Sequence, residues 1–195
     1  MQTAAVQEAP PQVGREAPEF RLPTAQGGEL GPQDFRGKRR LVLWFSKGLF
    51  CPFCRRNMAQ LGMRYDEIRA LDAEILQVTH NTVDEARIYF KSYPIKFPYL
   101  CDAERVAHDR YGVALVGKNV GGMLASTAVV ATDFVLRGER TPAPIPFLKR
   151  YSGNDAAQAV FILDRDGIVR VERRLGPNTP LPAASELLRE LASLG

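Results

Sequence analysis

Apolar residues fall into two kinds of pattern in the first half of the chain. Residues 40–46 are apolar on both faces of an extended chain, which is typical of a central strand covered on both sides of a sheet. From Pro52 onward, apolar residues recur every three or four positions and predict one helix that continues to about Leu71. The buried side of that helix is expected to consist of Met58, Leu61, Tyr65, Ile68 and Leu71.

Strands and helices continue to alternate beyond this helix. Thr82 and Glu85 have the spacing of a capping box, which predicts the start of a second helix. Asp102 is expected to cap a further helix, which Gly112 ends. The strands beside these helices are expected at residues 74–79 and 97–100.

The last part of the chain predicts a hairpin and a closing helix. Strands at 160–163 and 168–172 flank an Asp-Arg-Asp-Gly turn, and residues 185–194 have helical periodicity. Apolar side chains between 120 and 134 also fall on one helical face, which could pack on its own domain or form a dimer surface. This order of elements predicts an α/β fold with a mixed sheet and helices on both faces.

Length and composition fit a single globular domain. The chain has 195 residues, of which 45% are hydrophobic and 25% charged, so it can bury a core without disulfide staples. We expect a flexible N-terminal arm at residues 1–12 and one domain at 13–195. An insertion is expected within that domain at about 114–154, where the pattern is least regular.

Charge and hydropathy argue against two classes of partner. The net charge of +4 is too small, and the basic run at 38–40 too short, for a nucleic-acid surface. No stretch of eighteen apolar residues could span a membrane, and residues 1–18 lack the apolar core of a signal peptide. We therefore expect a cytoplasmic protein with no nucleic-acid or membrane partner.

Two of the three cysteines, Cys51 and Cys54, are expected at the junction between the first strand and the first helix. Cys51 would be the N-cap and Pro52 the first helical residue, so both thiols lie where a helix exposes unpaired N–H groups. The helix dipole and the nearby cations Lys47 and Arg55 favour thiolates. Residues three apart on a first turn can also form a disulfide. The pair is a candidate redox site.

A zinc site is the alternative for such a cysteine pair. Zinc needs two more ligands, and the candidates are Cys101, His80 and His108, but the chain has no second C-x-x-C and no H-x-x-x-H. We therefore expect no metal and no cofactor. Cys101 is expected to be a buried, unreactive thiol at a strand end, and both histidines are expected at the surface.

Several short motifs occur in one order along the chain. They are V-G-x-x-A-P-x-F-x-L at 13–22, F-R-G-K at 35–38, the strand and cysteines at 41–54, F-P-Y-L-C-D at 97–102 and F-I-L-D-x-x-G at 161–167. In this order and spacing they resemble the peroxiredoxin-like redoxins, related to alkyl hydroperoxide reductase and the thiol-specific antioxidant proteins. The resemblance implies a thioredoxin fold with a peroxiredoxin-like mixed sheet.

The chain departs from that family around its cysteines. Peroxiredoxins carry P-x-x-x-T-x-x-C, in which the cysteine attacks the peroxide. Alignment on Phe45 places Lys47 at that proline and Cys51 at that threonine. The attacking cysteine corresponds to Cys54, and Gln158 falls where the family has an arginine. The chain therefore resembles a C-x-x-C subgroup in which the frame is that of peroxiredoxins and the dithiol that of thioredoxins.

The resemblance implies a thiol-dependent oxidoreductase that cycles Cys51 and Cys54 between dithiol and disulfide. It would reduce disulfides, peroxides or both, with a thioredoxin- or glutathione-type thiol donor, and could form a homodimer. Either Cys51 attacks a disulfide and Cys54 resolves, or Cys54 attacks a peroxide and Cys51 resolves. In the second case Lys47, Gln158 and backbone N–H groups would polarise the peroxide. A non-enzymatic zinc- or partner-binding module on the same fold is the third alternative.

Overall fold

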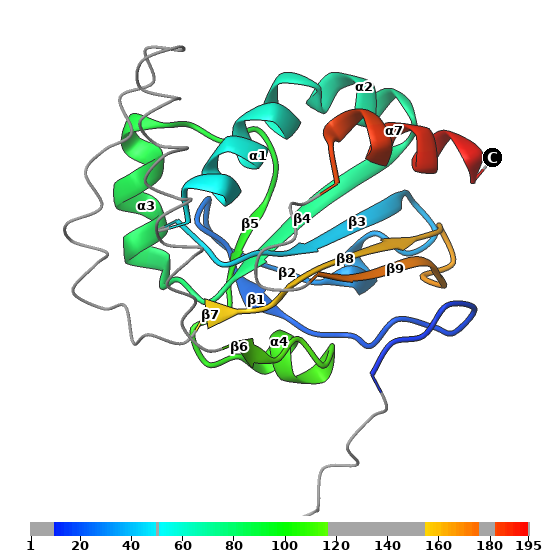
Figure 1. Cartoon of the computed structure of the whole chain (residues 1–195), viewed down its shortest axis with the longest axis horizontal. Coiled ribbons are helices and arrows are strands. Elements are labelled where there is room, and N and C mark those ends of the chain that lie inside the picture. The colour runs from blue at the N-terminus through cyan, green and yellow to red at the C-terminus, as the bar shows by residue number, and fades with distance from the viewer. Residues whose placement is uncertain (1–9, 50, 117–154, 176–181, 195) are drawn as a thin grey trace, which may run out of the picture.

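The apolar run after residue 39 forms β3 (Arg40–Phe45), the central strand of a five-stranded sheet in the computed structural model (Figure 1). The structure describes residues 10–49, 51–116, 155–175 and 182–194. The other strands of this sheet are β4 (Ala73–Thr79), β5 (Tyr99–Cys101), β8 (Gln158–Leu163) and β9 (Val169–Leu175). Their order is β5-β4-β3-β8-β9. Because β3 pairs parallel with β4 and antiparallel with β8, the sheet is mixed.

Helices cover both faces of this sheet (Figure 1). One face carries α1 (Pro52–Met63), α2 (Tyr65–Ala70), α3 (Val83–Ser92) and α7 (Ala184–Ser193), and the other carries α4 (Val106–Arg110). The smaller elements are η1 (Pro32–Asp34) and two strand pairs, β1 (Leu22–Pro23) with β2 (Glu29–Leu30) and β6 (Leu115–Val116) with β7 (Asp155–Ala156).

Alternate residues of β3 face opposite sides of the sheet, so this strand contributes to two cores. Val42 and Trp44 belong to the core under α1, α2 and α7, whereas Leu41, Leu43 and Phe45 belong to the core on the side of α4. All six residues of the strand are buried. This double burial explains why the strand has a continuous apolar sequence and no alternation.

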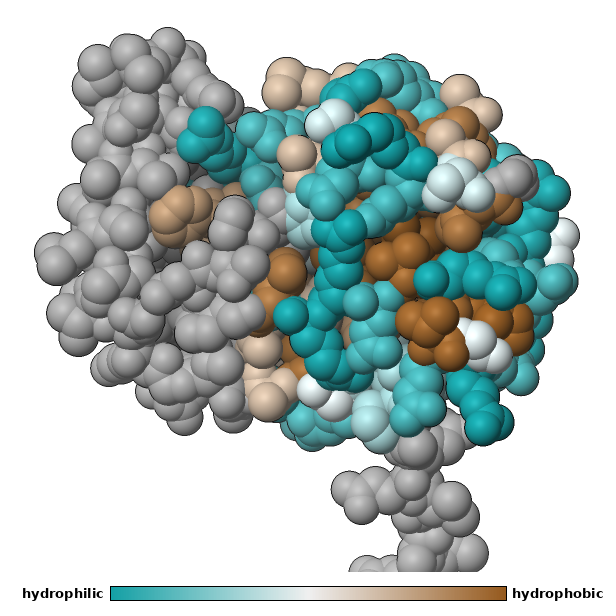
Figure 2. All heavy atoms as spheres, turned by 45° about the vertical axis from the view of Figure 1, so that its right-hand side comes forward, coloured by the Kyte–Doolittle hydropathy of each residue, from teal (hydrophilic) through white to brown (hydrophobic). Residues whose placement is uncertain are grey.

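The described surface carries few large apolar side chains. Figure 2 shows apolar patches interrupted by hydrophilic side chains on the side of the molecule where α7 and β9 lie. The exposed large hydrophobic residues come from four different segments: Val13, Met63, Ile88 and Val106. No helix in the described ranges has the length and hydropathy needed to cross a membrane.

Most elements lie where the sequence places them. The second predicted strand is β4, the hairpin strands are β8 and β9, and the closing helix is α7. The capping box is present, since the Glu85 amide donates to Thr82 Oγ1 at 3.3 Å and the Thr82 amide to Glu85 Oε2 at 3.0 Å. The mixed sheet with helices on both faces is therefore confirmed.

The helix predicted from Pro52 to Leu71 is wrong in one respect, because it is divided at Arg64 into α1 and α2. Gly62 lies just before the break, and a glycine inside a helix costs about 1 kcal/mol relative to alanine. The predicted buried side still faces the core: Met58, Leu61 and Ile68 are buried, and Tyr65 and Leu71 are partly buried against them.

The helix predicted to begin at Asp102 begins later, at Val106. Arg105, before it, has a left-handed φ of 62°. The Asp102 carboxylate turns inward: Oδ2 accepts the His108 amide at 2.9 Å and lies 2.7 Å from His108 Nδ1. The expectation that His108 is exposed is wrong, because its side chain is fully buried and packs edge-on against Phe45. The carboxylate partner offsets part of the free-energy cost of burying the imidazole.

The arm at 1–12 and the insertion at 114–154 lie largely outside the described residues, as does the helical face between 120 and 134. The first residues of the insertion, 114–116, are described, and so are the residues that follow it. They form β6 and β7, which pair antiparallel and bring Val116 opposite Asp155. The chain therefore leaves and re-enters the domain at one place.

Replacing Asp102 with alanine is expected to lower the free energy of unfolding by about 3 kcal/mol, because the buried His108 ring and amide lose their shared acceptor. Denaturant unfolding at neutral pH measures this. Asp109→Ala is the matched control, since Asp109 has a side chain 70% exposed and pairs with Arg105 at the surface. Its expected cost is under about 0.5 kcal/mol. Equal losses in the two variants would contradict the role given to Asp102.

Candidate active site

Cys51 and Cys54 lie at the sheet edge where β3 ends and α1 begins. Cys51 is the N-cap of α1, and its Sγ accepts a hydrogen bond from the backbone N–H of Cys54 at 3.3 Å. Pro52 occupies the start of the helix, where its missing N–H costs nothing. The predicted helix start is confirmed. One of the unpaired N–H groups of the helix end therefore points at the Cys51 sulfur.

The two thiols differ in access to solvent. Cys51 is 7% exposed and Cys54 only 1%, so both residues are buried, and they are not joined by a disulfide. Cys54 belongs to the third position of the helix, so its side chain points back into the core under α1. Cys51 is therefore the less deeply buried of the two cysteines.

Burial raises the pKa of Cys54 well above its ordinary value. A hydrogen bond with the Cys51 side chain and the electrostatic effect of Cys51 raise this pKa further. The backbone N–H and the positive charge of Lys47 lower the pKa, but their effects are smaller. At neutral pH Cys54 is therefore a thiol and not a thiolate.

The structure places two of the three expected auxiliary residues against Cys54. Gln158, the first residue of β8, is 5% exposed, and its Oε1 accepts a hydrogen bond from Cys54 Sγ at 3.4 Å. Lys47 presents its backbone N–H from the loop after β3. Arg55 follows Cys54 in α1 and is 7% exposed, but it is not among the groups that most affect the pKa of Cys54. Arg55 therefore lies beside the site without acting strongly on this sulfur.

A buried hydrogen-bond network holds the loop that leads into Cys51. Asn81 Oδ1 accepts the Leu49 amide at 3.0 Å and the Tyr99 hydroxyl at 2.9 Å. The Tyr99 oxygen accepts in turn from Thr79 Oγ1 at 2.9 Å. Gly48 has a φ of 92°, and a Cβ at that position would clash with Asn81 Oδ1. The loop conformation therefore depends on Asn81 and on a glycine at 48.

Sequence reasoning missed Asn81 and Tyr99. A signal for Asn81 was present, because it follows β4, which runs parallel beside β3. The carboxyl ends of parallel strands meet at one edge of a sheet, so a polar residue after β4 lies close to the cysteines that follow β3. Tyr99 is the first residue of the short strand β5, and no pattern in the sequence distinguishes it from a core residue.

The remaining candidate ligands do not join the pair. Cys101 is 3% exposed, and burial raises its pKa to about 12, which agrees with the expected inert thiol. His80 is half-buried, with its ring 6.4 Å from that of His108. Across the described ranges, no three His, Cys, Asp or Glu side chains gather into a possible metal site.

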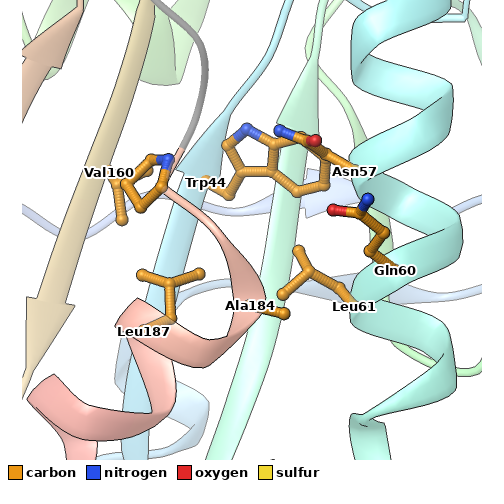
Figure 3. A pocket seen from close by; sticks show the side chains of 8 residues that line it. Trp44, Asn57, Gln60, Leu61, Val160, Ala184 and Leu187 are labelled. Atoms are coloured by element: carbon orange, nitrogen blue, oxygen red, sulfur yellow. The ribbon is translucent and has the colours of Figure 1, made fainter.

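A small pocket lies between α1 and α7, on the same face of the sheet as the cysteines (Figure 3). It is a shallow hollow that is partly open to solvent. Trp44 forms one wall, is 2% exposed and has a buried Nε1 without a hydrogen-bond partner. The other walls come from Asn57, Gln60, Leu61, Val160, Pro182, Ala184 and Leu187. Neither Cys51 nor Cys54 lines it, so the pocket is separate from the thiols.

Comparison with known proteins relates this geometry to one family. The family model described as AhpC/TSA family matches residues 13–172. Peroxiredoxin Bcp of Escherichia coli K12 is 23% identical over 128 residues, which cover 64% of this chain and 81% of the relative. Thiol-disulfide oxidoreductase ResA of Bacillus thuringiensis is 27% identical over 103 residues, which cover 52% of this chain and 58% of the relative.

Solved structures of peroxiredoxins share the fold. Reduced 2-Cys peroxiredoxin of Plasmodium vivax superposes with a TM-score of 0.66 at 19% identity, covering 93% of this chain and 95% of the other. Peroxidoxin BcpB of Mycobacterium tuberculosis gives 0.65 at 15% identity, covering 94% and 96%. The expected thioredoxin-like fold with a mixed sheet is therefore confirmed.

Gly48→Ala is expected to lower the free energy of unfolding by about 2 kcal/mol, because alanine is strained at a positive φ and its Cβ meets Asn81. Denaturant unfolding and the rate at which iodoacetamide modifies Cys51 report on the fold and on the loop. Gly62→Ala is the control, since a Cβ there meets nothing within 4 Å. It is expected to stabilise the helix by up to about 1 kcal/mol. A Gly48→Ala protein as stable as the wild type would refute the constraint.

Proposed function

The chain belongs to the AhpC/TSA family, and on this basis we propose that it is a thiol-dependent oxidoreductase that cycles Cys51 and Cys54 between a dithiol and a disulfide. Its substrate is a disulfide, a peroxide or both. A thiol donor of the thioredoxin or glutathione type returns the disulfide to the dithiol. The relatives carry both kinds of activity in their names, peroxiredoxin and thiol-disulfide oxidoreductase. The cytoplasm, which supplies such donors, is the compartment we propose.

The proposal rests on the difference in burial and pKa between the two thiols, which favours Cys51 as the attacking residue. Cys51 is the less deeply buried residue of the two, and its sulfur accepts a backbone N–H at the helix N-terminus, which stabilises a thiolate. Cys54 is buried, and its raised pKa keeps it protonated at neutral pH. A buried thiol three residues away is placed to resolve a mixed disulfide and poorly placed to meet a substrate.

The reaction with a disulfide substrate then has two exchange steps. The Cys51 thiolate attacks one sulfur, an S–S bond forms to the substrate, and the other half leaves as a thiolate. Cys54 loses its proton and attacks Cys51 Sγ, so that the Cys51–Cys54 disulfide forms and the second half leaves. The substrate gains two electrons, which the dithiol loses. A thiol donor reverses this oxidation of the protein.

Attack by Cys54 on a peroxide is the second candidate, and one observation favours it. The backbone N–H of Lys47 faces the Cys54 sulfur, beside Gln158, so a donor lies where a peroxide oxygen would bind. The Cys54 thiolate would take one peroxide oxygen and become a sulfenic acid, while the O–O bond breaks and the other oxygen leaves as water or an alcohol. Cys51 would then attack the sulfenic acid, so that the disulfide forms with loss of water. The burial of Cys54 makes this order the slower one in our proposal.

Serine variants of the two cysteines distinguish the two orders. With insulin as the disulfide substrate, Cys51→Ser is expected to abolish reduction, a loss of at least about 100-fold, because it removes the attacking thiolate. Cys54→Ser is expected to accumulate a mixed disulfide at Cys51, detected by mass spectrometry. Cys101→Ser is the control and should retain the wild-type rate.

The same variants test the alternatives with hydrogen peroxide. Suppose that the Cys51→Ser protein still consumes peroxide and forms a sulfenic acid on Cys54, and that the protein has no activity on insulin. Cys54 would then be the attacking residue, in place of Cys51. Stoichiometric zinc in the purified protein, with no Cys51–Cys54 disulfide after oxidation, would overturn the enzymatic proposal as a whole.

Alkylation of Cys54 gives a pH-dependent test. Only the thiolate reacts, and its fraction rises about tenfold per pH unit below the pKa. Because burial raises the pKa of Cys54 above the ordinary 9.0, the rate in a Cys51→Ser, Cys101→Ser protein should still be rising at pH 9. A plateau near pH 7 would show that Cys54 is a thiolate at neutral pH and would favour Cys54 as the attacking residue.

A further inference from the structure

Gln158 and Cys54 are far apart in the sequence but in contact in the fold. Gln158 opens β8 and lies 104 residues from Cys54, yet its Oε1 is 3.4 Å from the Cys54 sulfur. Both side chains are more than nine-tenths buried, so water does not compete for the bond. An amide oxygen can only accept, so the sulfur is the donor and must keep its proton while this hydrogen bond exists.

The other end of the same amide has the opposite preference. A half turn about the last side-chain torsion exchanges the oxygen for the NH₂ group, and this torsion is broad and roughly two-fold. The NH₂ group donates, so in the turned position it stabilises a thiolate. Glutamine can therefore serve Cys54 in both protonation states, whereas a carboxylate or a purely apolar side chain cannot.

We propose that Gln158 is a catalytic residue of the second exchange step, holding Cys54 as a thiol before Cys51 has reacted and donating to its sulfur when the thiolate forms. This inference rests on the proposed function, in which Cys54 resolves a mixed disulfide at Cys51. In this proposal Gln158 controls when Cys54 loses its proton and becomes the resolving thiolate.

The order of events follows from the surroundings of Cys54. While Cys51 is free, its side chain helps to raise the pKa of Cys54. Attack on a disulfide turns the Cys51 sulfur into one half of a neutral S–S bond, which removes its electrostatic effect. The Cys54 proton then passes to the departing thiolate or to solvent, and the amide of Gln158 turns its NH₂ group to the new thiolate. Cys54 attacks Cys51 Sγ, and the second half of the substrate leaves.

An aromatic disulfide that releases a coloured thiolate, dithiobis(nitrobenzoate), separates the two steps in one stopped-flow experiment on the full chain carrying Cys101→Ser. Attack by Cys51 releases one nitrothiobenzoate, and resolution by Cys54 releases the second. Gln158→Met has similar length, no donor and only a weak acceptor, and Gln158→Glu in its ionised form keeps acceptor oxygens without a donor. Both variants are expected to slow the second release about tenfold, the value of one hydrogen bond of about 1.4 kcal/mol, and to leave the first within about twofold.

The pH profile separates the two ends of the amide. Gln158→Glu should shift the rise of the second release to higher pH, because a carboxylate stabilises the thiol and repels the thiolate. Gln60→Leu is the control and should change neither release, because Gln60 lines the separate pocket between α1 and α7. Melting temperatures show whether each variant folds. If Gln158→Met does not fold, the near-isosteric Gln158→Glu still provides the test.

The outcomes separate the two proposals. A wild-type protein that releases no first equivalent through Cys51 fails the proposed function itself. A wild type that releases both, with an unchanged second release in Gln158→Met and Gln158→Glu, overturns only the role of Gln158. A Gln158→Glu protein that resolves as fast as the wild type, with the same pH profile, shows that the donor end is not used and also overturns it.

Discussion

The hydrogen bond from the Cys54 amide to Cys51 Sγ is the interaction on which the site depends. It makes the Cys51 sulfur the cap of α1, so this atom lies at the helix end that presents unpaired N–H groups. The residue three positions later packs in the core under α1. Helix geometry thus gives the two cysteines different positions, and the packed core around α1 buries Cys54 more deeply and raises its pKa.

The sheet decides what surrounds that helix end. α1 follows β3 at the carboxyl edge of the parallel strands. Asn81, after β4, contacts the loop before Cys51, and Gln158, at the start of β8, contacts the Cys54 sulfur. These contacts come from different parts of the chain, and all of them are buried. Polar groups in such a place must be satisfied by one another, so the loop, the thiol and the amide hold a single arrangement.

Local pattern was sufficient for much of the fold. The continuous apolar run identified β3, the capping box identified α3, and the turn sequence after residue 163 identified the β8–β9 hairpin. Prediction was less accurate around Asp102. Arg105 and not Asp102 is the N-cap of α4, although the Asp102 carboxylate accepts the backbone N–H of His108 in the first turn of that helix. The same carboxylate lies 2.7 Å from the ring of His108, which is buried and not at the surface as expected. Sequence spacing does not show that one carboxylate bonds both the backbone and the side chain of the same residue.

The sequence by itself determined the thiol pair, its place on a strand-to-helix turn and the family frame around it, because these depend on spacing and on local backbone preference. The tertiary structure alone decided which thiol is more deeply buried, that Gln158 and not Arg55 contacts it, and that Asn81 fixes the loop. The physical reason is that burial and long-range hydrogen bonds belong to the packed sheet. A pKa in the core depends on neighbours that the linear chain does not place together.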